Sequence, residues 1–145
     1  MKAETYRELF DRQQKELSDF PIAYAFNEEQ LKQALEKLGA KDVSECVTYL
    51  NMGDVMLKKD IPAFKDMMKR HREEMLEALK DKEFAYEAFV YEMDNHEYAI
   101  NWSGDADVLG CFYLNEKKLR EMDLEDAYNR ARATHFKHAR EWDII

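Results

Sequence analysis

The sequence is poor in the residues that break or cross-link regular structure. Its 145 residues include four glycines and two prolines, which excludes collagen-like, linker-rich and low-complexity proteins. The two cysteines, Cys46 and Cys111, lie far apart and belong to no CxxC motif or other metal-ligand spacing. We therefore expect neither a disulfide framework nor a zinc knuckle, but two small thiols in a reducing compartment.

Long apolar runs are also missing. The first residues carry charges throughout and contain no apolar stretch of signal-peptide length. No window of the sequence approaches the roughly 20 apolar residues that cross a bilayer. These absences predict a soluble, cytoplasmic protein that has no membrane partner.

What is present suits one globular domain. Hydrophobic residues make up 46% of the chain, enough for a single domain over residues 1–145 to bury its own core. The apolar residues recur at helical spacing in some segments and alternate in others. The pattern predicts helices over residues 3–17, 28–38, 61–79, 83–94, 105–112 and 124–142, a short helix from Asn115, and strands over residues 22–26, 46–50, 55–57 and 98–102. This order indicates an α+β fold in which helices pack against a small antiparallel sheet.

Several polar residues and one glycine mark where these helices begin and end. Asn27, with Gln30 three residues later, approximates a capping box. Gly39 ends the helix that Asn27 opens, and Asp105 is placed to cap a later short helix. Asn95 follows the central helix, where an asparagine can take the left-handed conformation that ends a helix.

The negative charge is concentrated in one part of the chain. The net charge of −9 argues against a protein that coats nucleic acid or anionic lipid. Residues 83–129 hold 12 acidic and 3 basic side chains, while the segments before and after them carry net charges of −2 and +2. Such an acidic cluster can simply solvate helix edges, or it can bind a basic protein partner. The candidate partner-binding residues are Glu83, Glu87, Asp94, Asp105 and Asp107.

The string YEMDNHEYAIN places several chemically useful side chains together. If the helix continues to His96, then Glu92 and His96 lie four residues apart on one face and can form a hydrogen bond. A carboxylate beside an imidazole is one element of a general base or of a metal site, and Glu97 adds a second carboxylate. The same contact can instead fasten the helix end to the following strand. Glu92, His96 and Glu97 are therefore candidate catalytic residues with a structural alternative.

Two further histidines lie three residues apart on the last predicted helix. His135 and His138 can share a metal ion if a carboxylate approaches them, and the pair Asp105 and Asp107 can supply one. His135 also falls on the apolar face of that helix, where a hydrogen-bonded core histidine is the alternative. The two histidines are candidate metal ligands, although the sequence as a whole predicts no cofactor.

The sequence lacks the glycine patterns of phosphate loops, dinucleotide sites and hydrolase nucleophile elbows. The last helix is locally basic through Arg130, Arg132, Lys137 and Arg140. Basic residues near a helix C-terminus complement the helix dipole, and nucleic-acid binding is the alternative explanation.

Part of the chain resembles a known family. The motifs that carry the resemblance are YEM-NHEY at Tyr91–Tyr98 and D-DVL-CF at Asp105–Phe112, preceded by AFNEEQ, a short helix ending in Leu-Gly and a glycine-containing turn. Over about residues 20–113 the chain is similar to small proteins of unknown function encoded by bacteriophages, plasmids and integrative elements of gut bacteria. The resemblance implies a soluble accessory protein of a mobile element, with no known activity and no catalytic residues to carry over. Where those relatives tend to have paired glycines, this chain has Asn51-Met52-Gly53-Asp54, which argues against a phosphate- or ligand-binding turn.

Taken together, these features predict a non-enzymatic accessory protein. We expect it to bind a protein partner of basic character through the acidic segment, residues 83–129. One alternative is a small hydrolase or metal-dependent enzyme centred on Glu92, His96 and Glu97. Another is a nucleic-acid-associated protein that uses the C-terminal helix, which the overall acidic charge disfavours.

Overall fold

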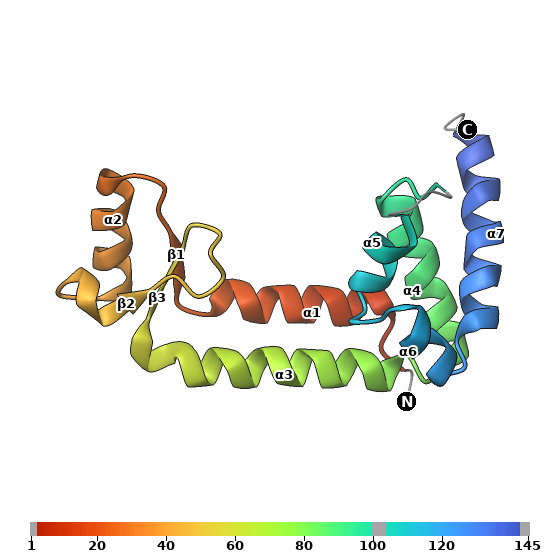
Figure 1. Ribbon diagram of the computed structural model, residues 1–145, viewed down its shortest axis with the longest axis horizontal. Helices are drawn as coiled ribbons and strands as arrows, with labels where there is room; N and C mark the ends of the chain where they lie inside the picture. Colours follow the sequence, from red (N-terminus) through yellow and green to blue (C-terminus); the bar gives the residue numbers. More distant parts are fainter. Residues whose placement is uncertain (1–2, 100–103, 143–145) are drawn as a thin grey trace. The chain divides into compact units, whose positions relative to one another are not determined.

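The computed structural model describes residues 3–99 and 104–142 of the chain. These residues form seven α-helices, two short 3-10 helices and three strands (Figure 1). In chain order the elements are α1 (Tyr6–Asp19), β1 (Ile22–Tyr24), α2 (Glu28–Leu38), η1 (Val43–Glu45), β2 (Cys46–Val47), β3 (Asp54–Leu57), η2 (Lys58–Asp60), α3 (Ile61–Ala78), α4 (Lys82–Asn95), α5 (Gly104–Gly110), α6 (Glu116–Glu121) and α7 (Glu125–Glu141). The predicted α+β class with a small antiparallel sheet is confirmed.

The chain folds into two compact units. Residues 11–70 form one, which we call the sheet unit, and the described parts of residues 1–10 and 71–145 form the other, the helical unit. That the two units belong to one domain stays a prediction. Among the described residues, no helix combines the length and the apolar character that crossing a membrane requires.

The sheet has β3 at its centre, in the order β1-β3-β2, and both pairings are antiparallel. The antiparallel pairing expected of these strands is therefore confirmed, but β2 ends at Val47 rather than at residue 50. The reason lies in Asp54, which is fully buried and accepts hydrogen bonds from the backbone N–H groups of Tyr49, Leu50 and Met52 at 2.9, 3.0 and 3.1 Å. These bonds hold residues 49–52 in a turn, so this segment does not pair with β3.

Helices α2 and α3 both pack against the sheet. Ala23 and Val55 cluster with Ala34 of α2, whereas Ile22 and Met56 cluster with Phe64 of α3. Helix α2 begins as predicted, because the Asn27 side chain accepts from the Gln30 N–H and the Gln30 side chain accepts from the Phe26 N–H. It ends as predicted at Gly39, whose φ of 72° is left-handed.

Helix α4 is the centre of the helical unit. Phe84, Ala85, Ala88, Phe89 and Met93 are all buried, and α4 packs along the length of α7 (Figure 1). The start of α1 adds Tyr6 and Leu9 to the same core. The short helix expected from Asn115 is α6, which Asn115 caps by accepting from the Lys118 N–H.

Three local predictions need correction or fall outside the described residues. The left-handed residue after α4 is Glu97, with φ of 49°, and not Asn95, which is still helical. Asp105 lies inside the first turn of α5 and does not precede it. Of the strand predicted over residues 98–102, Tyr98 and Ala99 belong to no strand, and the other three residues lie outside the described part of the chain.

Candidate metal centre

The end of α4 holds two of the residues singled out in the sequence. The helix ends at Asn95, and the His96 N–H donates to the Glu92 carbonyl oxygen at 2.9 Å, so the two residues remain one helical turn apart. Glu97 then turns the chain away. Glu92 lies on the buried face of the helix with 4% of its surface exposed, whereas the His96 side chain is exposed.

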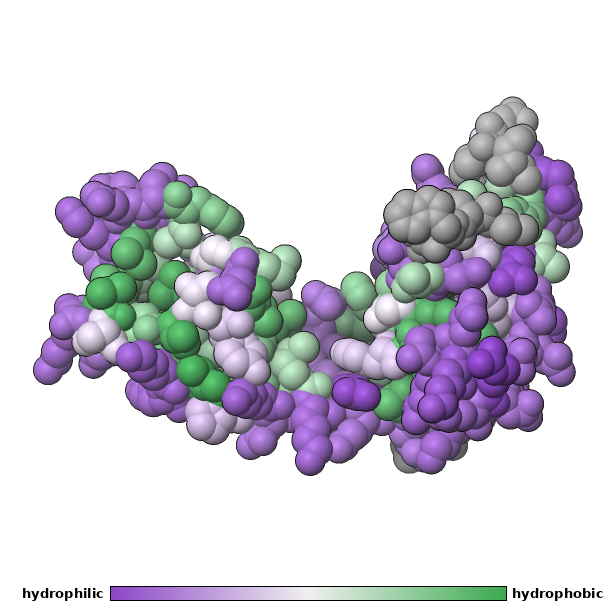
Figure 2. Space-filling model, viewed as in Figure 1, coloured by the Kyte–Doolittle hydropathy of each residue, from purple (hydrophilic) through white to green (hydrophobic). Residues whose placement is uncertain are grey.

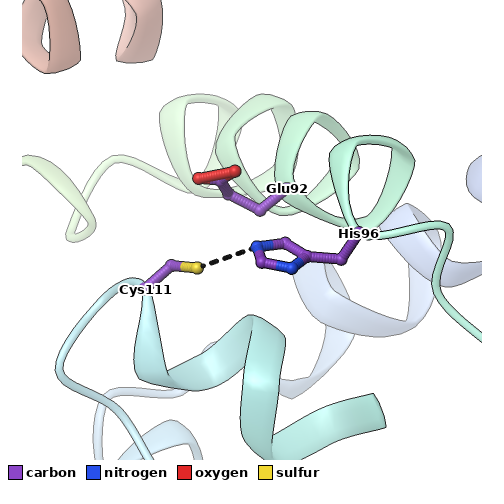
Figure 3. Close-up of side chains that lie close together, drawn as sticks. All are labelled: Glu92, His96 and Cys111. Atoms are coloured by element: carbon purple, nitrogen blue, oxygen red, sulfur yellow. Dashed lines mark hydrogen bonds between the residues drawn. The ribbon is translucent and has the colours of Figure 1, made fainter.

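Cys111 joins these two residues from the end of α5. Its Sγ lies 3.4 Å from His96 Nε2, and the nearest ligand atoms of Glu92, His96 and Cys111 all lie within 4.8 Å of one another (Figure 3). Within residues 3–99 and 104–142, no other group of three His, Cys, Asp or Glu residues converges in this way. The imidazole therefore contacts the thiol, and Figure 3 shows no hydrogen bond between Glu92 and His96 of the kind the helix spacing predicted.

The sulfur-to-nitrogen distance fits a shared metal ion. With Zn–S of about 2.3 Å and Zn–N of about 2.0–2.1 Å, a tetrahedral ion holds these two ligand atoms about 3.5 Å apart. The observed 3.4 Å between Cys111 Sγ and His96 Nε2 is close to that separation. Binding would require little movement of these two side chains.

The electrostatic surroundings disfavour a free thiolate at this position. Burial, together with the negative charges of Glu92 and Asp107, raises the pKa of the Cys111 thiol to about 11. A cysteine nucleophile needs the opposite surroundings, because its pKa must fall toward neutrality. The same negative charges favour a bound cation, so the site suits a metal ion better than nucleophilic catalysis by sulfur.

The Glu92 carboxylate is held by two neighbours. Tyr6 at the start of α1 donates its hydroxyl to Oε2 at 2.7 Å, and the Asn95 side-chain amide donates to Oε1 at the longer distance of 3.4 Å. Neighbours that orient a ligand in this way are typical of metal sites.

Sequence reasoning therefore found two of the three residues and missed the third. Glu97 does not join the group, since it is the left-handed residue that redirects the chain. Cys111 had no local signal, because it is far from Glu92 in sequence and only the path of α5 brings it close. Its one usable signal was that Glu92 and His96 lie in the YEMDNHEY motif and Cys111 in the DVLGCF motif.

The histidines of α7 meet a different carboxylate from the predicted one. Asp94 accepts hydrogen bonds from Nδ1 of both His135 and His138, at 2.7 and 2.9 Å, and His135 Nε2 contacts the Tyr98 carbonyl oxygen at 2.7 Å. His135 is fully buried and both of its ring nitrogens are engaged. These hydrogen bonds fasten α7 to the end of α4. His135 is therefore the hydrogen-bonded core histidine that the sequence offered as an alternative to a metal ligand.

The predicted acidic surface is partly used within the molecule. Glu83 pairs with Arg130 at 3.2 Å. Asp105 accepts from the hydroxyls of Tyr98 and Tyr128 at 2.6 Å each and pairs with Arg132 at 3.4 Å. Burial raises the pKa of Asp105, but these hydrogen bonds and the charge of Arg132 outweigh it, and the pKa falls below the ordinary value.

Two of the five acidic candidates, Glu87 and Asp107, have exposed side chains that make no such side-chain contact with the part of the chain that the structure describes. Hydrophilic side chains cover much of the helical unit on the face drawn in Figure 2. The acidic surface that remains available is therefore smaller than the charge count indicates.

Comparison with known proteins gives one match. The model of a family described as "Family of unknown function (DUF7659)" matches residues 5–133, which include all three residues of the candidate metal centre. No curated protein and no solved structure matches the chain. The prediction of a family without a known function is thus confirmed, and the match says nothing about the kind of genome that encodes it.

Proposed function

We propose that this chain, which belongs to the DUF7659 family of unknown function, binds a divalent transition metal through the Glu92 carboxylate, His96 Nε2 and Cys111 Sγ. The observation that carries the proposal is the convergence of these three ligand atoms within 4.8 Å. Zn²⁺ is the ion that such a set of sulfur, nitrogen and oxygen ligands suits best among the common ions, because Mg²⁺ and Ca²⁺ prefer oxygen ligands alone.

The number of ligands supports a reactive site over a purely structural one. Structural zinc sites are closed by four protein ligands, while catalytic sites use three and leave a position for water. Among the residues that the structure describes, three protein ligands converge here, and the exposed His96 places the site at the surface, where a substrate can reach it. A Zn²⁺ ion held by these residues would lower the pKa of a bound water toward about 7 and so supply a nucleophile for esters and related bonds, and metal-assisted hydrolysis is the activity we propose.

Calorimetric titration of the metal-free protein with Zn²⁺ tests the binding. We expect one ion per chain, and we expect Cys111→Ser or His96→Ala to weaken binding by at least about 100-fold, since even outer residues of metal sites contribute 10–100-fold. Cys46→Ser and His138→Ala are matched controls that remove another cysteine and another histidine outside the site. Equal losses in the site variants and the controls, or no binding by the wild type, would contradict the proposal.

Hydrolysis is tested separately with an activated ester such as p-nitrophenyl acetate. Zinc-loaded wild type should be faster than the metal-free protein, and Cys111→Ser should remove the difference while Cys46→Ser retains it. If the metal binds without any change in rate, the site is a binding site and the hydrolytic part of the proposal fails.

The exposed acidic residues favour a second candidate function, binding of a basic protein partner. Residues 83–129 carry a net charge of −9, and Glu87 and Asp107 remain exposed. We expect a partner recovered at low salt to be lost when both are changed to the matching amides. Glu28→Gln with Glu29→Gln is the control, because it removes two exposed charges of the sheet unit. If the recovery of a partner changes neither with salt nor with these substitutions, binding of a basic partner through the acidic surface is contradicted.

A setting in mobile genetic elements is the remaining part of the proposal. It is supported only by the resemblance of the YEMDNHEY and DVLGCF motifs. The genes that surround members of the family provide the test, since transfer, replication or anti-defence genes should recur beside them. Neighbours drawn only from ordinary metabolic genes would contradict it.

A further inference from the structure

Tyr6 contacts the candidate metal centre from the far end of the sequence. It is the first residue of α1, only 3% of its surface is exposed, and its hydroxyl donates to Glu92 Oε2 at 2.7 Å. Its ring packs against four other aromatic rings, those of Phe10, Phe84, Tyr91 and Phe112. A phenylalanine would make the same ring contacts, so packing alone does not explain the hydroxyl.

The hydroxyl has a distinct task at a buried carboxylate. Glu92 is 4% exposed, and a charged group at that depth needs hydrogen bonds to replace water. The Tyr6 hydroxyl supplies such a bond, because a tyrosine hydroxyl is protonated near neutral pH and this one donates to Glu92 Oε2. Tyr6 can therefore orient the carboxylate.

We infer that Tyr6 is a positioning residue of the metal centre, whose hydroxyl holds Glu92 Oε2 and leaves Oε1 to bind the ion. This inference rests on the proposed metal-binding function. Within residues 3–99 and 104–142, Oε1 accepts one side-chain hydrogen bond, the 3.4 Å contact from the exposed Asn95, which an ion can replace easily. Glu92 would then bind through one oxygen, and the ion would have four ligands when one water is counted.

Without the hydroxyl, Oε2 becomes available and the carboxylate can bind through both oxygens. The ion would then tend toward five ligands, and the site would lose its preference for small tetrahedral ions. Tyr6 thereby links the start of α1 to the metal selectivity of a site formed by α4 and α5.

Tyr6→Phe tests the inference, with Co²⁺ as a visible substitute for Zn²⁺. We expect Co²⁺ and Zn²⁺ to bind about 10–100-fold more weakly to this variant, as for other outer residues of metal sites. The intense visible absorption of tetrahedral Co²⁺ should weaken as the coordination number rises. Tyr128→Phe is the matched control, because it removes another buried hydroxyl that donates to a carboxylate, that of Asp105 at 2.6 Å. Tyr128→Phe should keep the metal affinity and the Co²⁺ spectrum of the wild type.

The outcomes separate the two proposals. If the wild type binds no Co²⁺ or Zn²⁺, the metal-binding function fails and the role of Tyr6 fails with it. If the wild type binds and Tyr6→Phe has the same affinity and spectrum, only the role of Tyr6 is overturned. Should Tyr6→Phe not fold, X-ray absorption of the zinc-loaded wild type decides, with four ligands expected and a carboxylate bound through both oxygens contradicting the inference.

Discussion

Cys111 shows how a single residue depends on its surroundings. The burial and the nearby carboxylates that raise its pKa to about 11 make it a poor nucleophile and a protonated thiol at neutral pH. Because a metal binds the thiolate, the same surroundings make metal binding a proton-releasing event.

This coupling predicts a pH dependence with a definite sign. Below the thiol pKa of about 11, the free site holds a proton that the metal must displace, so Zn²⁺ affinity should rise with pH. The contribution of this one proton is about tenfold in affinity per pH unit. Titrations between pH 6 and 8 in buffers of different ionisation enthalpy measure both the slope and the proton released. A dissociation constant that does not change with pH would argue against a thiolate ligand.

The Glu92 charge has a measurable effect even without metal. Glu92→Gln removes a charge that raises the Cys111 pKa, so alkylation of Cys111 by iodoacetamide at pH 8 should become faster in the metal-free protein. Mass spectrometry of the two cysteine peptides gives both rates in one experiment, with Cys46 as the internal control. A faster rate at Cys46 as well would indicate general loosening of the fold.

The sequence predicted part of the candidate metal centre. Glu92 and His96 were found because helical spacing places them on one face. Cys111 could not be found this way, since its approach depends on how α5 packs against α4. Asp94 was assigned to a binding surface, but its position between His135 and His138 is likewise a tertiary contact.

The elements themselves were predicted best where a side chain bonds to the backbone beside it. Asn27, Gly39 and Asn115 mark helix ends that the structure reproduces, because such caps are local interactions. The predicted strand that begins at Cys46 is too long. Its end is set by hydrogen bonds from the turn to buried Asp54, and the sequence pattern does not reveal these bonds. The left-handed residue is Glu97 rather than the predicted Asn95, because α4 continues through Asn95.

Asp54 carries a prediction for the sheet unit. Burial raises the pKa of its carboxyl, but the backbone hydrogen bonds of the turn outweigh burial and lower the pKa below the ordinary 3.8. Hydrogen bonds to a charged group contribute about 1.5–3 kcal/mol, so Asp54→Ala should reduce the free energy of unfolding by about 2 kcal/mol or more at pH 7. Urea unfolding measures this loss, and Asp66→Ala on the exposed face of α3 is the control.

The pH dependence of this effect follows from the lowered pKa. The stabilisation by Asp54 should be fully present above about pH 4 and should be lost as the pH falls through its value in the folded protein. The difference in stability between wild type and Asp54→Asn should therefore shrink below pH 4. A difference that grows on acidification would contradict the assignment of Asp54 as the ionised acceptor of the turn.

At the scale of the whole molecule, charge and chemistry coincide in one unit. The sheet unit, residues 11–70, holds 11 acidic and 10 basic side chains, so nearly all of the net charge of −9 belongs to the helical unit. The candidate metal centre lies in that same unit. Total composition could not show this, because it does not reveal which segments fold together.

Metal binding should accordingly stabilise one unit more than the other. An ion at 100 times its dissociation constant adds about 2.7 kcal/mol to the stability of the state that binds it. Hydrogen exchange should therefore slow around the end of α4 and in α5 when Zn²⁺ is added, while the protection of β1–β3 changes less. Equal slowing in both units, or slowing confined to the sheet unit, would place the ion elsewhere.

The most direct test of the metal centre is a Co²⁺ titration followed by the near-ultraviolet charge-transfer band that arises when a thiolate binds the ion. We expect the band to saturate at one equivalent in wild type and in Cys46→Ser, and to disappear in Cys111→Ser. The absence of the band in wild type, or its persistence in Cys111→Ser, would contradict the proposal that Glu92, His96 and Cys111 form a metal site.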